Sequence, residues 1–317
     1  MLQGGLGQMH TPVMLQEAVD FLVTSSSGKY VDATFGRGGH SGAILQRLSP
    51  AGRVLAIDRD PQAIAWGRSR FVDEPRLSLV QASFADLDVL LERHGMTAGV
   101  DGVLLDLGVS SPQLDDAGRG FSFLRDGPLD MRMDPGHGFS AAQWIARARV
   151  EEIEKVLREY GEERFARRMA AAIVRERVVA SIDTTARLAE ILTQANPAWE
   201  KGKHPATRGF QAIRIFVNGE LEALACALRQ AMRALAAGGR LVVISFHSLE
   251  DRIVKRFMRD NSRAASYAGL PESMQPQLRR IGKALRASDE EVRDNPRARS
   301  AVLRVAEKLQ PQVVAHG

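Results

Sequence analysis

Short apolar runs and longer amphipathic stretches alternate along the first third of the chain. A short apolar run bounded by polar residues is typical of a buried strand, whereas apolar residues spaced three and four apart predict a helix. The pattern predicts strands at 30–31, 54–58, 77–81 and 100–106, with helices between them at 41–48, 61–70 and 84–94. Because strands and helices in turn are typical of a parallel sheet covered by helices, we expect an α/β fold.

A long polar segment, residues 108–138, interrupts this alternation. It is rich in Gly, Asp, Pro and Arg, and a connection of this length is usually functional. Helical patterns follow it at 141–149, 150–159 and 163–179. On the last of these, Arg164, Arg168 and Arg175 line a face away from the apolar stripe, which predicts an amphipathic helix with a basic edge.

The α/β pattern resumes after residues 190–208, where two Pro-containing steps are consistent with a connection back to the first domain. We expect a helix at 220–236 that Gly238 and Gly239 end, then strands at 241–246, 283–287 and 301–305. The chain is therefore predicted to form one Rossmann-like α/β sheet from residues 1–112 and 209–317, with a helical insertion at 113–208.

A glycine loop joins the first predicted strand to the first predicted helix, in the sequence YVDATFGRGGH at 30–40. Strand, glycine loop and helix in that order form the first nucleotide-binding turn of doubly wound α/β domains. The third glycine of a dinucleotide fingerprint is absent, since position 41 is Ser41. The usual spacing of methyl donor loops, aligned on Gly36 and Gly38, finds Thr34 in place of the acid and His40 in place of the last glycine. The loop is therefore atypical for both classes.

Polar or aromatic residues follow each of the first four predicted strands. Because ligands of open α/β sheets bind at the carboxyl ends of the strands, we expect these residues to converge. Asp58 suits the ribose hydroxyls and Phe84 suits an adenine face. The loop offers no basic residue for a pyrophosphate, so S-adenosylmethionine fits at least as well as a nicotinamide dinucleotide. The candidates for donor contact on these grounds are Gly38, Gly39, His40, Asp58, Phe84 and Asp106, although each alone is also consistent with a structural role.

The loop after the fourth strand is the segment placed nearest to the reacting atoms. Asp106 and the hydroxyls of Ser110 and Ser111 are our candidates for orienting the substrate. A second polar segment, FHSLEDR at 246–252, also follows a buried strand. Its pattern favours a charged helix start, with a salt bridge between Asp251 and Arg252, over a hydrolase triad, because no nucleophile elbow is present.

The 317 residues carry a formal net charge of +5 and a pI near 9.6, which is compatible with an anionic partner. The surplus is concentrated at the end of the chain, where residues 252–317 hold 14 Lys or Arg and 7 Asp or Glu. Such a segment is either a solvated basic face or a surface that contacts phosphates.

Several classes of protein are excluded by composition. No stretch approaches the ~20 consecutive apolar residues of a membrane span, and the N-terminal sequence lacks a secretory signal, so we expect a cytoplasmic protein with no membrane partner. Cys226, the one cysteine, excludes an internal disulfide and a cysteine-rich zinc site, and we predict no metal site.

Nine motifs together resemble one family. They are HTPVML (10–15), DATFGRGGHS (32–41), AIDRDPQAI (56–64), DGVLLDLGVSSPQLDDAGRGFSF (101–123), DGPLDMRMD (126–134), YGEERFARR (160–168), HPATRGFQAIRIFVNGEL (204–221), SFHSLEDRIVKRF (245–257) and NPRARSAVLRVAE (295–307). The chain resembles the MraW (RsmH) family of ribosomal RNA small-subunit methyltransferases from residue 10 to residue 307.

The resemblance implies an enzyme that uses S-adenosylmethionine to methylate the N4 amino group of a cytidine in the decoding (P-site) region of 16S rRNA. It implies that the donor contacts are Gly38, Gly39, His40, Asp58, Phe84, Asp106 and Gln113. It also implies that the insertion recognises the substrate, and we expect Arg164, Arg168 and Arg175 to contact RNA phosphates.

Two other functions are left open by the sequence. A nicotinamide oxidoreductase would use the same loop and acid, and a non-catalytic RNA-binding assembly factor would need only the basic surfaces. Naked RNA and a nearly complete small subunit are both open as the substrate, and the sequence does not define an oligomeric state.

Overall fold

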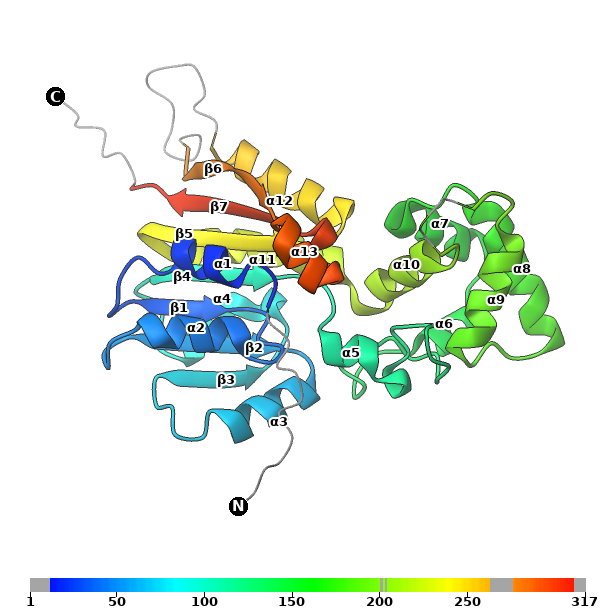
Figure 1. Ribbon diagram of the computed structural model, residues 1–317, viewed down its shortest axis with the longest axis horizontal. Helices are drawn as coiled ribbons and strands as arrows, with labels where there is room; N and C mark the ends of the chain where they lie inside the picture. Colours follow the sequence, from blue (N-terminus) through cyan, green and yellow to red (C-terminus); the bar gives the residue numbers. More distant parts are fainter. Residues whose placement is uncertain (1–11, 200–201, 203, 263–275, 311–317) are drawn as a thin grey trace. The chain divides into compact units, whose positions relative to one another are not determined.

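The computed structural model describes residues 12–199, 202, 204–262 and 276–310. The chain folds into two compact units (Figure 1). The first unit comprises Met1–Gly108 and Glu222–Gly317, and the second comprises Val109–Leu221. The predicted insertion at 113–208 falls within the second unit.

A seven-stranded sheet forms the centre of the first unit, in the order β3-β2-β1-β4-β5-β7-β6. The strands β1 to β5 are parallel, whereas β7 runs antiparallel to both of its neighbours. The predicted α/β fold is confirmed. The strands are β1 (Lys29–Asp32), β2 (Arg53–Asp58), β3 (Leu77–Gln81), β4 (Val100–Asp106), β5 (Leu235–Ser245), β6 (Leu278–Arg286) and β7 (Val302–Lys308).

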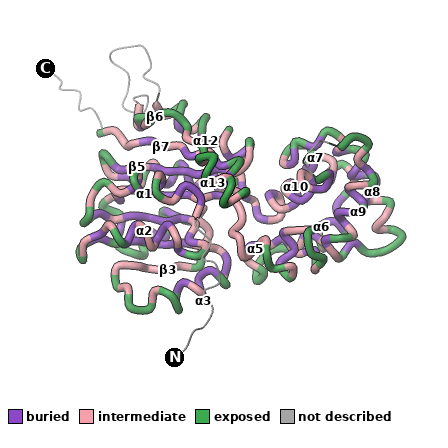
Figure 2. Tube along the Cα trace, viewed as in Figure 1, coloured by how far each residue is buried: buried purple, intermediate pink, exposed green. Residues whose placement is uncertain are grey.

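Helices cover both faces of this sheet. Successive strand residues point to opposite faces, so Val54 and Ala56 pack in one apolar cluster while Leu55 and Ile57 pack in the other. One face is covered by α1 (Leu15–Leu22), α2 (Gly39–Arg47), α3 (Pro61–Arg70) and α13 (Asp289–Asp294). The other is covered by α4 (Leu87–Arg93), α11 (Glu220–Ala234) and α12 (Ser248–Asp260). Figure 2 shows the buried residues along the central strands.

Several boundaries differ from those predicted; for example, β6 begins at Leu278 and α8 at Ala166. A 3-10 turn, η1 (Phe84–Asp86), precedes α4. The helix α11 ends at Ala234, and β5 begins before Gly238 and Gly239 and runs through them. The prediction that the two glycines end the helix is wrong, because the backbone of Leu235 pairs with Val100 of β4 and starts the strand earlier.

The second unit consists mainly of helices around its own apolar core. The expected connection at 190–208 contains the end of one helix and the start of the next, and both helices belong to this unit. The helices are α5 (Ser111–Asp115), α6 (Ala141–Arg147), α7 (Val150–Gly161), α8 (Ala166–Val179), α9 (Thr185–Ala195) and α10 (Thr207–Asn218), with a 3-10 turn, η2 (Ala117–Arg119).

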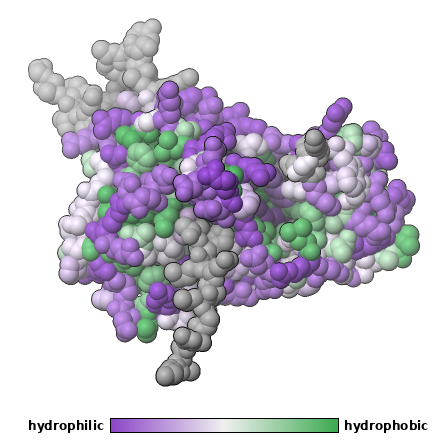
Figure 3. Space-filling model, in the orientation of Figure 1, coloured by the Kyte–Doolittle hydropathy of each residue, from purple (hydrophilic) through white to green (hydrophobic). Residues whose placement is uncertain are grey.

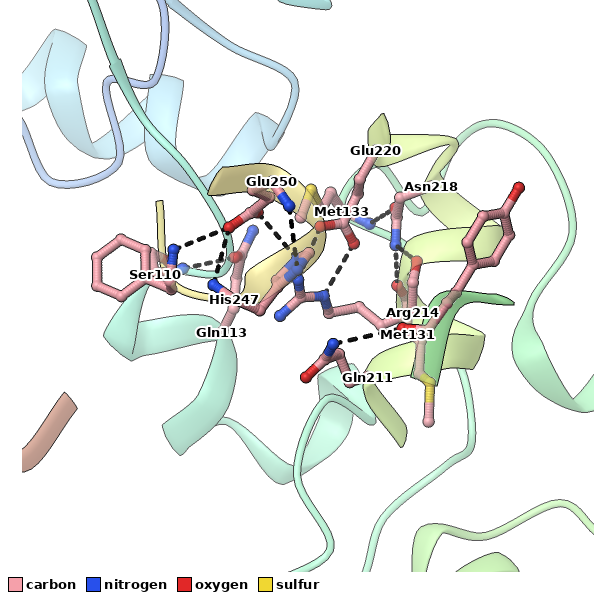
Figure 4. Close-up of polar contacts among 12 residues, drawn as sticks. Ser110, Gln113, Met131, Met133, Gln211, Arg214, Asn218, Glu220, His247 and Glu250 are labelled. Carbon is pink, nitrogen blue, oxygen red and sulfur yellow. Dashed lines mark hydrogen bonds and ion pairs between the residues drawn. The ribbon is translucent and has the colours of Figure 1, made fainter. Parts of the chain in front are cut away.

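The buried amide of Asn218 holds the long polar segment in place (Figure 4). Its Nδ2 donates to the carbonyls of Met131 (2.7 Å) and Arg214 (2.9 Å), and its Oδ1 accepts from the N–H of Met133 (2.8 Å). Met131 is fully buried with a left-handed φ of 63°. The part of the segment around Met131 and Met133 is therefore packed into the core of the second unit.

Hydrophilic residues dominate the face of the molecule drawn in Figure 3. Within the described ranges, no helix combines the length and the apolar character that crossing a membrane requires.

Candidate functional site

The strand order of the first unit reverses between β1 and β4, because β2 and β3 lie on one side of this pair and β5 lies on the other. Ligands of doubly wound sheets bind in the crevice at the carboxyl ends of the strands beside such a point. Three acids end the strands there: Asp32 on β1, Asp58 on β2 and Asp106 on β4.

The glycine loop needs glycine for two different reasons. Gly38 has a φ of 67°, in the left-handed region that favours glycine, and it precedes the first residue of α2. A Cβ atom on Gly39 would lie 2.1 Å from Cγ of Pro12, so a side chain there would have to displace the Pro12 ring. The loop therefore brings main chain, without side chains, to the end of β1.

Asp58 ties the glycine loop to the end of β2. Its Oδ2 accepts a hydrogen bond from the N–H of Gly36 (2.7 Å), and its Oδ1 accepts one from the N–H of Asp60 (2.8 Å). Burial raises the pKa of Asp58 to about 6, against the lowering effect of these two hydrogen bonds. The half-buried carboxylate is thus ionised at neutral pH, and each oxygen keeps a lone pair for a further donor.

His40 of α2 and Asp106 of β4 face each other, with His40 Nδ1 3.5 Å from Asp106 Oδ2. Burial lowers the pKa of His40 to about 4, so its imidazole is neutral at pH 7. Burial, and then the charges of Asp32 and Glu250, raise the pKa of Asp106 well above its ordinary value.

Two buried polar atoms of this pair have no hydrogen-bond partner in the described part of the chain: Nε2 of His40 and Oδ1 of Asp106. Buried polar atoms in folded proteins are nearly always satisfied, so atoms of this kind mark a place where a ligand or water binds. The pair lies at the β1–β4 switch point, where the fold independently places a ligand.

Asp32 was not among the predicted site residues. It is fully buried, and its carboxylate accepts hydrogen bonds from the Ser41 hydroxyl (2.6 Å) and the Thr34 N–H (3.1 Å). Burial raises its pKa. Asp32 therefore holds both ends of the glycine loop. Its position directly after the apolar strand run is the feature of the sequence by which it could have been found.

Phe84 lies in the 3-10 turn after β3 and is half-buried against the apolar cluster that also contains Leu87. The N–H of Ala82 donates to the carbonyl of Asp58 (3.0 Å), which keeps the end of β3 beside the end of β2. The structure thus brings the start of this turn to the strand that Asp58 ends.

Three other predicted residues, Ser110, Ser111 and Gln113, belong to the second unit. Ser110 precedes α5 and Ser111 is its first residue. Gln113 is buried, and its Oε1 accepts a hydrogen bond from the N–H of Ser110 (2.9 Å). Within this unit, Gln113 therefore stabilises the start of α5.

The segment 246–252 starts helix α12, as expected. His247 is the N-cap, and the buried Glu250 accepts a hydrogen bond from the N–H of Phe246 (2.8 Å). Asp251 binds Arg304 of β7 through two hydrogen bonds of 2.7 and 3.0 Å, a partner that the sequence did not predict.

Of the predicted basic edge, Arg168 and Arg175 lie on α8 and Arg164 lies in the turn before it; all three arginines are exposed. A surface depression of about 430 Å³ opens beside the start of this helix and includes Arg164 and Arg168. Arg175 is not part of its lining; its Nε lies 3.3 Å from Glu176. The full lining is Arg158, Arg164, Phe165, Arg167, Arg168 and Ala171.

Comparison with known proteins gives a family match over nearly the whole chain. The sequence model of the MraW methylase family matches residues 7–309. The ribosomal RNA small subunit methyltransferase H of Chromohalobacter salexigens is 59% identical over 307 residues, which are 95% of this chain and 92% of that protein.

Among solved structures, the chain is similar to an rRNA methylase from Streptococcus thermophilus, with a TM-score of 0.42 and 13% identity over 93% of this chain and 94% of that one. It is also similar to Aeropyrum pernix fibrillarin in complex with natively bound S-adenosyl-L-methionine, with a TM-score of 0.39 and 10% identity over 92% and 73% of the two chains.

Proposed function

The chain belongs to the MraW methylase family, and on that premise we propose that it transfers a methyl group from S-adenosylmethionine to the N4 amino group of a cytidine in the decoding (P-site) region of 16S rRNA. Its partner is the small ribosomal subunit or its RNA, in the cytoplasm. The observation that carries the proposal is the pair of unsatisfied buried atoms, His40 Nε2 and Asp106 Oδ1, at the switch point of the sheet.

The residues at the strand ends fit S-adenosylmethionine. The carboxylate of Asp58 is an acceptor for ribose hydroxyls, and the Phe84 ring is an apolar partner for adenine. Gly38 and Gly39 have no side chain between the main chain and the donor, so the main chain can approach it closely. Side chains at these two positions would also clash with Phe35 and Pro12. The neutral imidazole of His40 and the side chains of Asp106 and Gln113 are the remaining polar contacts.

When bound, S-adenosylmethionine supplies an electrophilic methyl group on a sulfonium sulfur. Cytosine N4 is a weak nucleophile because its lone pair is delocalised into the ring. An acceptor for the amino hydrogens stabilises the positive charge that develops on nitrogen. Asp106, Ser110 and Ser111 are the groups proposed for this role, and no strong general base is needed, since the proton leaves N4 after transfer.

RNA recognition is assigned to basic surfaces on both units. On the second unit these are the exposed arginines Arg164, Arg168 and Arg175. On the first unit, α12 exposes one basic face at positions spaced three and four apart. The members of that face are Arg252, Lys255, Arg256 and Arg259. Both surfaces suit RNA phosphates.

The test is methyl transfer from labelled donor to small-subunit RNA, naked and assembled, followed by mass-spectrometric mapping of the modified nucleosides. We expect N4-methylcytidine in the decoding region. Label on another base, or no label on either substrate while the protein binds the donor, would refute the proposal. Parallel calorimetric titrations with S-adenosylmethionine and NAD should show binding of the first only.

A further inference from the structure

Four of the six residues that line the depression beside the start of α8 are arginines. Arg158 comes from α7, whereas Arg164, Arg167 and Arg168 come from the turn before α8 and its first residues. Phe165 and Ala171 complete the wall. We call this feature, with its six lining residues, the arginine depression. It is an open depression of about 430 Å³ on the surface and not an enclosed pocket.

The positive charge of the arginine depression is only partly balanced by neighbouring acids. Arg158 pairs with Glu154 and is 64% exposed. Glu163, the acid next to Arg164, is buried, and its Oε1 accepts a hydrogen bond from the N–H of Phe165 (2.9 Å). The carboxylate of Glu163, which is the nearest in sequence to Arg164, therefore binds the main chain inside the fold.

The start of α8 adds to the positive electrostatic potential of the arginine depression. Arg167 and Arg168 occupy its first turn, which contains no acid, although the helix dipole favours negative charge there. The N-cap, Phe165, provides no side-chain acceptor for the first N–H groups. By contrast, α7 begins with Glu151 and Glu152. An anion bound in the arginine depression would meet both the guanidinium groups and the positive end of the helix.

Phe165 makes the arginine depression unlike a purely ionic surface. Its ring is half-buried, and the guanidinium of Arg164 lies 5.5 Å from its centroid. Aromatic rings beside arginines are typical of sites for unpaired nucleotides, where bases stack and phosphates pair with cations. A regular duplex keeps its bases stacked inside, so a base that contacts Phe165 has to come from a single strand.

We propose that the arginine depression binds one nucleotide of a single-stranded RNA segment, with its phosphate on Arg167 and Arg168 and its base or sugar against Phe165. This deepens the proposed function and rests on RNA being the substrate. It also separates the three arginines of the predicted basic edge: Arg164 and Arg168 belong to the site, whereas Arg175 lies outside the lining and beside Glu176.

The experiment measures binding of the full-length protein to a labelled single-stranded oligoribonucleotide, by fluorescence anisotropy at several salt concentrations. For Arg167→Ala/Arg168→Ala we expect a loss of affinity on the order of tenfold or more, and a salt slope lower by about 0.7, because the two arginines bind one phosphate. Arg167→Lys/Arg168→Lys should keep the slope but lose part of the affinity, because lysine cannot bind phosphate bidentately. Phe165→Leu should weaken single-strand binding and leave duplex binding unchanged.

The matched control is Arg147→Ala/Arg149→Ala, which removes the same charge from exposed positions of the same unit. An equal loss in this control would overturn the proposal, since it would show a general charge effect. Unchanged binding in the Arg167 and Arg168 variants would also overturn it. So would equally tight, competing binding of poly-aspartate, which would point to an acidic protein as the occupant.

A folding readout separates this role from a structural one. Arg167→Glu/Arg168→Glu should raise the unfolding temperature, because acids suit the first turn of a helix, while it removes RNA binding. A lower unfolding temperature would mean that the arginines stabilise the fold.

Methylation and binding together separate this inference from the proposed function. If the wild type methylates RNA but the variants bind RNA normally, only this inference fails. If the variants lose RNA binding but no methylation occurs, only the proposed function fails.

Discussion

Nδ1 of His40 lies 3.5 Å from Oδ2 of Asp106, which joins the helix after the glycine loop to the end of β4. Each partner keeps one buried polar atom without a hydrogen bond in the described structure. Burying the imidazole and the carboxyl with unsatisfied polar atoms costs free energy, unless a ligand forms hydrogen bonds with those atoms. This relationship therefore connects the fold to the proposed donor site.

His40→Leu, which keeps much of the volume but removes both ring nitrogens, should weaken binding of S-adenosylmethionine by about 1 to 3 kcal/mol. The fold should persist, because the substitution also removes an unsatisfied buried group. Since the pKa of His40 is about 4, its protonation contributes nothing to donor affinity above neutral pH. Calorimetry and thermal unfolding of the variant measure both effects; normal donor affinity would remove His40 from the site.

Asp58→Ala should weaken donor binding by ~1.5 to 3 kcal/mol, the range for a charge-assisted hydrogen bond. The pH dependence has a definite sign. Because the pKa of Asp58 is about 6, the ionised acceptor predominates above that pH, and donor affinity should fall as the pH drops through it. Asp58→Asn should bind weakly and without this pH dependence. A wild-type titration that stays flat across pH 6 would contradict the assignment.

Gly38→Ala should perturb the donor loop through both φ and steric contact. Alanine in the left-handed region costs about 1 kcal/mol, and its Cβ would lie 2.7 Å from the Phe35 ring and 2.8 Å from Phe71. Gly95 is a matched control, because its φ of 66° is nearly the same but a Cβ there would have nothing within 4 Å. We expect Gly95→Ala to lose only stability and Gly38→Ala to lose donor affinity as well. Equal donor affinities in the two variants would show that the loop tolerates a side chain.

Asn218→Ala should destabilise the second unit by about 2 to 4 kcal/mol, because it removes three hydrogen bonds and leaves buried main-chain groups of Met131 and Met133 unpaired. Gln211→Ala provides the comparison, since Gln211 makes a longer bond of 3.3 Å to the Tyr160 carbonyl from the same helix. Denaturant unfolding of the two variants gives the difference. Equal losses would mean that Asn218 does not organise the segment.

The sequence predicted those parts of the fold that depend on local pattern. The strand at 54–58 and the Asp60 cap of α3 can be predicted from neighbouring residues alone, because an apolar run and a capping side chain are local features. The partner of Asp251 could not be predicted in this way, since Arg304 is brought to it by the β5–β7 pairing. Asp32 was missed for a related reason: its role depends on the Ser41 hydroxyl, which only the folded loop places against it.

The chemical step should depend on Asp106 more than on the serines. An acceptor for the N4 hydrogens stabilises charge that exists only in the transition state, so its loss lowers the rate of transfer without a matching loss of donor affinity. Asp106→Asn keeps the shape but replaces one carboxyl oxygen with an NH2 group that donates and cannot accept, and we expect a single-turnover rate lower by about 100-fold at saturating donor. For Ser110→Ala and Ser111→Ala we expect about tenfold, because a neutral hydroxyl is a weaker acceptor. Rates equal to the wild type in all three variants would exclude this orienting role, whereas a loss of donor affinity alone in Asp106→Asn would assign that carboxyl to the donor.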